Sequence, residues 1–120
     1  MKYLCLIYDD EKKWETMSKA EADAYMGEYF QFTENVKSSG HYLGGNALQP
    51  VQTATTIRSR NGKLSTTDGP FAETKEQLGG FYLIDARDLD EAIQVASRIP
   101  PTRLGCIEVR PIRELVAPER

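Results

Sequence analysis

Charged and turn-forming residues are concentrated at residues 68–76, which read DGPFAETKE. The carboxylate of Asp68 can accept backbone N–H groups in an Asp-Gly-Pro turn, or it can stand at the mouth of a pocket as an acid–base group. Glu73 and Lys75 follow in the same segment. They are either solvated or form a charged lid or interface clamp. We therefore consider this segment the first candidate for a functional region.

His41 is the only histidine of the chain. Because imidazole titrates near neutral pH, His41 is a candidate general acid or base, and the alternative is a partly exposed structural histidine. One histidine and two separated cysteines do not make a ligand set for zinc. The glycine pairs at 44–45 and 79–80 lack the spacing of a phosphate-binding loop. We expect neither a metal nor a cofactor.

Aromatic and basic side chains are candidates for substrate binding. Tyr25 and Tyr29 belong to the apolar stripe of a predicted helix, and Tyr82 lies in a predicted strand. These tyrosines either form core or line a pocket between that helix and the sheet, with Asp68 beside them. Arg58, on a predicted exposed strand, either protects a sheet edge or binds an anionic substrate.

The composition is that of a single globular domain of 120 residues, with 40% hydrophobic and 28% charged residues. The net charge of −3 disfavours nucleic acid or an anionic membrane as the main partner. Cys5 and Cys106 lie in apolar runs outside any C-x-x-C pair, so we expect buried free thiols. No apolar run approaches roughly 18 residues and no signal-peptide pattern is present, which predicts a cytoplasmic protein without a membrane segment.

The N-terminal third predicts a strand followed by a long helix. Residues 3–8 are apolar at every position, which is typical of a strand covered on both faces. The charged run at 9–13 predicts a solvated loop. Ser18 and Glu21 form a capping box, and apolar residues at helical spacing predict an amphipathic helix over 19–39.

Further strands are predicted in the rest of the chain, at residues 41–45, 51–60, 63–67, 80–84 and 106–110. Asn61-Gly62 is a strong signal for a two-residue hairpin turn between two of them. Asp88 and Glu91 repeat the capping pattern before a second amphipathic helix, which Pro100-Pro101 should stop.

The order of these elements predicts an α+β, ferredoxin-like βαββ(β)βαβ fold, with both helices on one face of a single sheet. The two central strands would then leave a large apolar patch on the other face. A second copy packing sheet to sheet covers that patch most simply, so we expect a homodimer.

The run DGPFAETKEQLGGFYLI, with KYLCLIY near the N-terminus and IEVRPI near the C-terminus, resembles the DGPF subgroup of the YCII-related proteins. The resemblance covers residues 2–113 and implies a ferredoxin-like domain that dimerises as an α+β barrel. In the wider family a His–Asp pair is proposed as the active site, with the histidine on the first helix. Residues 19–39 contain no histidine, so only Asp68 is a candidate for carry-over.

Three kinds of function stay open at this point. The first is a small-molecule site between the first helix and the sheet, either in a binding protein or in an enzyme that uses acid–base chemistry. The second is a regulatory interaction module, because genes that resemble this one often lie beside extracytoplasmic-function sigma factors. The third is a structural dimer without chemistry.

Overall fold

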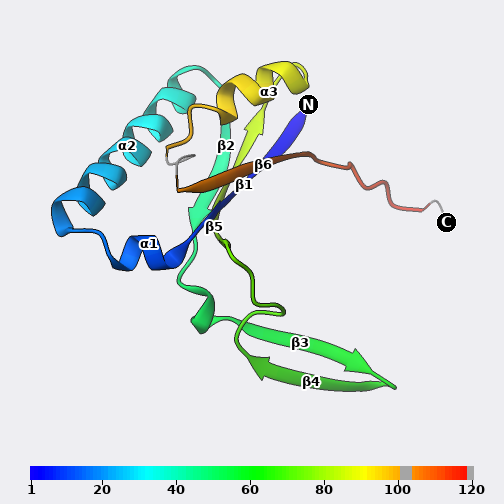
Figure 1. The fold of residues 1–120 in the computed structure, drawn as a ribbon. Helices are drawn as coiled ribbons and strands as arrows, with labels where there is room; N and C mark the ends of the chain where they lie inside the picture. The colour runs from blue at the N-terminus through cyan, green and yellow to red at the C-terminus, as the bar shows by residue number, and fades with distance from the viewer. Residues whose placement is uncertain (101–103, 119–120) are drawn as a thin grey trace.

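The computed structural model describes residues 1–100 and 104–118 as a mixed α+β structure (Figure 1). Its elements in chain order are β1 (Lys2–Asp9), α1 (Glu11–Glu15), α2 (Lys19–Ser38), β2 (Tyr42–Ala47), the 3₁₀ turn η1 (Val51–Thr53), β3 (Thr55–Arg60), β4 (Lys63–Asp68), β5 (Gln77–Asp85), α3 (Leu89–Ala96) and β6 (Gly105–Pro111).

The main sheet is antiparallel and has the strand order β2-β5-β1-β6. The two strands predicted to be covered on both faces, β1 and β5, lie at its centre, and β6 is an edge strand as expected. This arrangement is consistent with a ferredoxin-like α+β fold. The hairpin β3–β4 forms a separate two-stranded sheet, so the expectation of a single sheet is wrong for these two strands.

Both long helices begin where the capping patterns predicted. The hydroxyl of Ser18 accepts a hydrogen bond from the backbone N–H of Glu21 at 3.1 Å, and the carboxylate of Asp88 accepts one from the N–H of Glu91 at 2.9 Å. α3 ends at Ala96, before the prolines that were expected to stop it, and Pro101 lies outside the described residues. These local signals are reliable because they depend on near neighbours in the chain.

The core lies between one face of the main sheet and the helices α2 and α3 (Figure 1). Every second side chain of β1 is buried against the helices. The largest fully buried side chains are Cys5, Ile84, Val36, Val95 and Ile99. The expectation of two buried thiols is wrong for Cys106, which is exposed on edge strand β6. Phe30, an apolar residue of the predicted helix, is 69% exposed on α2.

The other face of the main sheet carries no helix. Its central side chains are paired across the strands, Leu4 opposite Leu83 and Leu6 opposite Phe81, and all four are only half-buried. We call these four residues the open face. An apolar surface of this kind is typical of a face that packs against something else.

The charged run at residues 9–13 is not the solvated loop that was expected. Asp9 is the last residue of β1 and is buried, and α1 begins two residues later. Asp10 caps α1, because its carboxylate accepts the backbone N–H of Lys12 at 2.9 Å. An N-cap followed by three charged residues is sufficient for a short helix when a neighbouring sheet holds it.

Candidate functional site

The buried carboxylate of Asp9 lies where residues 69–76 lead into the main sheet. Asp9 is 6% exposed and is the only buried charged residue in the described part of the chain. Its backbone pairs with Gln77, the first residue of β5. Its Oδ2 accepts a hydrogen bond from the indole Nε1 of Trp14 at 2.9 Å. β1 and α1 together therefore fix the position of this carboxylate.

Oδ1, the second oxygen of Asp9, receives no hydrogen bond from the residues that the structure describes. Gly79 faces it, and a Cβ atom at that position would lie 3.3 Å from Oδ1. Oδ1 keeps some contact with solvent, since the described residues include no fully buried side-chain oxygen or nitrogen that lacks a partner. A carboxylate oxygen left in this state can accept a hydrogen bond from a ligand.

Burial raises the pKa of Asp9, because desolvation disfavours the charged carboxylate. The hydrogen bond from Trp14 opposes this effect, while the negative charges of Glu11, Glu76 and Asp10 add to it. The side chain therefore holds its proton more readily than an exposed aspartate does. A raised pKa is what a carboxyl group needs to give and take protons nearer to neutral pH.

Hydrogen bonds hold α1 against the start of β5. The backbone N–H of Glu11 donates to Oε1 of Gln77 at 3.0 Å, and Oε2 of Glu11 accepts the N–H of Val51 at 3.0 Å. Trp14 is carried by this short helix. α1 therefore carries Trp14, which binds the Asp9 carboxylate, and Glu11, which binds Gln77 directly after residues 69–76.

Aromatic side chains surround the carboxylate on the helix side. The rings of Trp14 and Tyr25 meet edge to face, with centroids 5.5 Å apart. Burial raises the pKa of Tyr29, and the charges of Asp9, Tyr82 and Tyr25 contribute to the shift in that order. We call Asp9, Trp14, Tyr25 and Tyr29 the Asp9 cluster. The structure thus places Tyr29 against the core between α2 and the sheet, and Tyr25 against Trp14 of α1.

Tyr82 lies deeper in the same interface. Its hydroxyl shares a hydrogen bond of 2.8 Å with Oγ1 of Thr33, and its ring meets that of Phe32 edge to face, with centroids 5.1 Å apart. At 9% exposure it is part of the core. Its place between α2 and the sheet matches the interface that the sequence predicted, although its hydroxyl already has a partner.

Asp68 lies outside this interface. It is the exposed last residue of β4, opposite Thr55 in the separate hairpin, and its carboxylate takes no hydrogen bond from the described residues. The turn that follows is held by other groups. The N–H of Gly69 donates to the carbonyl of Ala54 at 2.7 Å, and Oγ1 of Thr56 donates to the carbonyl of Gly69 at 2.8 Å.

The other charged candidates also lie on the surface. A guanidinium nitrogen of Arg58 donates to the carbonyl of Phe71 at 3.3 Å, which ties the hairpin to residues 69–76. Glu73 and Lys75 are exposed, and neither forms an ion pair within the described residues. The structure does not connect these side chains to the Asp9 cluster by any hydrogen bond or ion pair.

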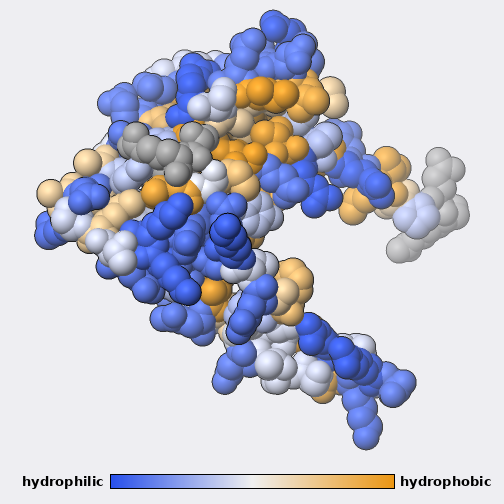
Figure 2. All heavy atoms as spheres, viewed as in Figure 1, coloured by the Kyte–Doolittle hydropathy of each residue, from blue (hydrophilic) through white to orange (hydrophobic). Residues whose placement is uncertain are grey.

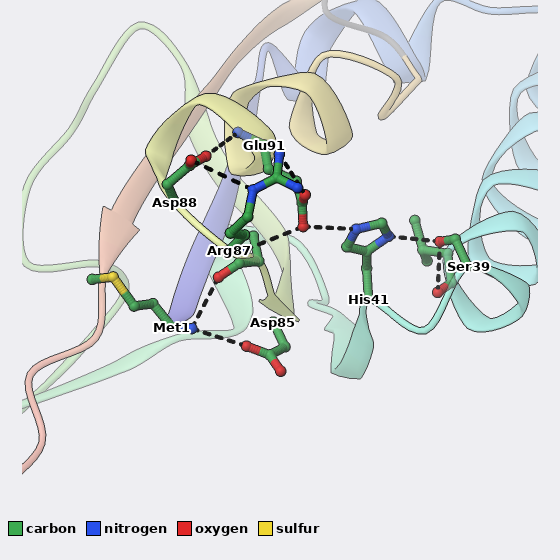
Figure 3. A network of polar contacts seen from close by, with 9 residues as sticks. Met1, Ser39, His41, Asp85, Arg87, Asp88 and Glu91 are labelled. Carbon is green, nitrogen blue, oxygen red and sulfur yellow. Dashed lines mark hydrogen bonds and ion pairs between the residues drawn. The ribbon is translucent and has the colours of Figure 1, made fainter.

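His41 belongs to a different group, at the opposite end of β5 (Figure 3). Nδ1 of His41 is 2.7 Å from the hydroxyl of Ser39, and Nε2 is 3.2 Å from Oε1 of Glu91. The same carboxylate accepts the backbone N–H of Arg87 at 3.1 Å and pairs with its guanidinium at 3.3 Å. The His41 network therefore joins the end of α2, the start of β2 and the start of α3.

The hydrogen bond from the backbone of Arg87 is the main cause that lowers the pKa of Glu91, and contacts with His41 and the Arg87 guanidinium add to it. A polar hollow of about 360 Å³ lies beside this network. A second hollow, of about 320 Å³, lies between α2 and the residues after α3, next to Phe32 and Arg98. Neither hollow is lined by Asp9.

Asp9 is not among the predicted site residues, because the charged run at 9–13 predicted a solvated loop. The signal was nevertheless present, since Tyr3, Cys5, Ile7 and Asp9 follow one another at every second position. Alternation along a strand puts all four side chains on one face. Extending the strand by one residue would have placed this carboxylate on the buried face.

Residues 1–100 and 104–118 contain neither a cluster of metal ligands nor a membrane-spanning helix. No three histidine, cysteine, aspartate or glutamate side chains come together there as a metal site would require. None of the helices there is both long and apolar enough to cross a bilayer.

Comparison with known proteins gives two matches. The family model of the YCII-related domain matches residues 1–116. A protein of Rhizobium meliloti (strain 1021), named "Uncharacterized protein R00369", is 40% identical over 115 residues, which cover 93% of this chain and 92% of that protein. The range of the family match, residues 1–116, spans the positions of the Asp9 cluster and the His41 network.

Proposed function

Because the chain belongs to the YCII-related domain family, we propose that it is a homodimeric small-molecule-binding domain in which Asp9 provides acid–base chemistry. The observation that carries the proposal is Oδ1 of Asp9, an acceptor oxygen on a buried carboxylate that receives no hydrogen bond from the described residues. Because this oxygen keeps some contact with solvent, a donor group of a ligand can reach it.

The Asp9 cluster supports this role better than the His41 network does. Both ring nitrogens of His41 and both oxygens of Glu91 already have partners. These contacts have a structural role, because they hold α2, β2 and α3 together. Asp9, by contrast, has one oxygen that is bonded and one that is free to meet a ligand.

The chemistry that follows is proton exchange with a ligand that offers an N–H or O–H group to Oδ1. Trp14 holds the carboxylate in place through Oδ2. The rings of Tyr25 and Tyr29 provide apolar surface for the ligand. Residues 69–76 end at Glu76, whose charge acts on Asp9, and Gln77 directly after them pairs with Asp9, so this segment is placed to respond to a bound ligand.

The homodimer is supported by the open face. Four half-buried apolar side chains at the centre of a sheet favour packing against a second sheet. A second copy of the chain provides such a surface with two-fold symmetry.

A thermal-shift screen against a library of small metabolites tests the proposal. The wild type, Asp9→Asn and the control Asp23→Asn are screened together, because Asp23 is an exposed carboxylate on α2. We expect at least one compound that raises the melting temperature of the wild type and the control but not of Asp9→Asn. Equal responses of all three proteins would exclude Asp9 from the site.

A further inference from the structure

The hairpin β3–β4, residues 55–68, stands away from the rest of the molecule as an arm (Figures 1 and 2). Its strands pair only with each other. The molecule accordingly measures 48 × 44 × 18 Å, which is broad and thin for a chain of 120 residues. A single two-stranded hairpin is at best marginally stable in water, so an arm of this kind needs a surface to pack against.

The two faces of the arm differ in chemistry. Leu64 lies opposite Ser59, which is two residues from Ile57 on the same strand, so Ile57 and Leu64 share one face. The side chains of Ile57 and Leu64 are 66% and 76% exposed. The opposite face carries the cations Arg58, Arg60 and Lys63. No carboxylate in the described residues forms an ion pair with these three.

The charge of the arm is opposite to that of the body. The arm carries three cations and one carboxylate, a charge of +2, so the rest of the chain carries −5 of the total of −3. An apolar face beside a basic face fits a surface that is both apolar and acidic. A second copy of this chain offers both properties outside its open face, since its body is acidic and carries exposed apolar side chains such as Phe30.

We propose that the arm docks on the body of a second copy of the chain, with Ile57 and Leu64 at the contact. This inference rests on the homodimer of the proposed function and adds an interface that the sheet faces alone do not contain. Docking then removes from water the outer edges of β3 and β4 and the side chains of Ile57 and Leu64, which are exposed in a single chain.

The experiment measures dimerisation of the full chain by light scattering over a dilution series. The variant is Ile57→Ser/Leu64→Ser, and the matched control is Ser65→Thr, which changes the basic face of the arm and keeps its hydroxyl. Circular dichroism checks that each protein is folded. Trypsin cleavage after Arg58, Arg60 and Lys63 reports separately whether the arm is covered.

We expect a wild-type dimer whose arm resists trypsin, and a dissociation constant raised at least tenfold in Ile57→Ser/Leu64→Ser together with cleavage in the arm. The control should match the wild type. An unchanged dissociation constant in the double variant would overturn the docked arm and leave a dimer formed by the open faces.

Two other results would also overturn the inference. A wild type that stays monomeric at micromolar concentration would remove the arm contact and the homodimer together, while ligand binding at Asp9 would still be decided by the thermal-shift screen. Binding of a labelled DNA duplex that is lost in Arg58→Gln/Arg60→Gln, with dimerisation unaffected in both arm variants, would assign the arm to nucleic acid instead.

Discussion

At the scale of single residues, the buried carboxylate of Asp9 lowers the stability of the fold when it is ionised, and the same burial suits it to proton exchange. Its pKa is raised by burial, so the folded protein binds this proton more tightly than the unfolded chain does. Between the two pKa values the folded state carries more protons, and the free energy of unfolding therefore falls as the pH rises through the folded-state pKa. At neutral pH the ionised side chain destabilises the fold relative to a neutral one of the same shape.

We accordingly predict that Asp9→Asn melts several degrees above the wild type at neutral pH, because the amide keeps an acceptor for Trp14 without the buried charge. The difference should shrink as the pH falls through the folded-state pKa of Asp9. Asp9→Ala, which loses the Trp14 bond, should be less stable than Asp9→Asn by about 1–2 kcal/mol. Melting curves between about pH 4 and pH 8 test this. Equal losses in both variants at every pH would show that Asp9 is purely structural.

Gly79 offers a second test at this scale. A Cβ at Gly79 would press on Oδ1 of Asp9 at 3.3 Å, whereas a Cβ at Gly44 would meet nothing within 4 Å. We predict that Gly79→Ala keeps the fold and loses most of the thermal shift caused by a ligand of the wild type. Gly44→Ala should respond as the wild type does. A full ligand response in Gly79→Ala would place the ligand away from Oδ1.

At the scale of elements, patterns that depend on neighbouring residues predicted the structure correctly, whereas patterns that depend on packing between elements did not always do so. The caps at Ser18 and Asp88 and the turn at Asn61-Gly62 depend on residues next to one another, and all three are confirmed. Phe30 and Cys106 show the limit of periodicity. An apolar residue at the right spacing is still exposed when no element packs over it, and neither α2 nor edge strand β6 is fully covered.

Of the Asp9 cluster, the sequence predicted the two tyrosines of α2 but not the carboxylate. The helix pattern predicted Tyr25 and Tyr29 on the apolar stripe of the helix, and Tyr29 packs against the core while Tyr25 contacts Trp14 of α1. The carboxylate beside them was not chosen, because the predicted strand over residues 3–8 stops one residue before Asp9. Asp68 and Asp9 are each the last residue of a strand, but only β1 lies at the centre of the main sheet, and only Asp9 is buried.

The His41 network yields a prediction for the helices. The pKa of Glu91 is lowered, so its stabilising effect is present above its unfolded pKa of about 4.3 and is lost as the pH falls through the folded-state value. Glu91→Gln should therefore melt below the wild type at neutral pH, and the gap should close in acid. Glu34→Gln, which changes an exposed glutamate on α2, is the control. A gap that persists unchanged in acid would mean that the charge of Glu91 is unimportant.

At the scale of the whole molecule, the open face and the arm both expose apolar side chains to solvent in a single chain. The core is shared by α2, α3 and one face of the sheet, and nothing in the described residues covers the other face. Sequence periodicity already predicted this imbalance, because β1 and β5 are apolar at positions on both faces. The arm was harder to foresee, since pairing between β3 and β4 says nothing about whether they join the main sheet.

Leu83 tests the open face without disturbing the core. Its side chain lies opposite Leu4 and is only half-buried, so Leu83→Glu should leave a folded chain. Burying a leucine contributes about 1.5–3 kcal/mol, and two-fold symmetry counts the site twice, so we predict that the dimer dissociation constant rises at least about a hundredfold. Ile93→Glu places the same charge on the outer face of α3, where Ile93 is 49% exposed, and should not change dimerisation. Light scattering of both variants decides the matter, because a Leu83→Glu dimer as tight as the wild type would mean that the open faces do not meet.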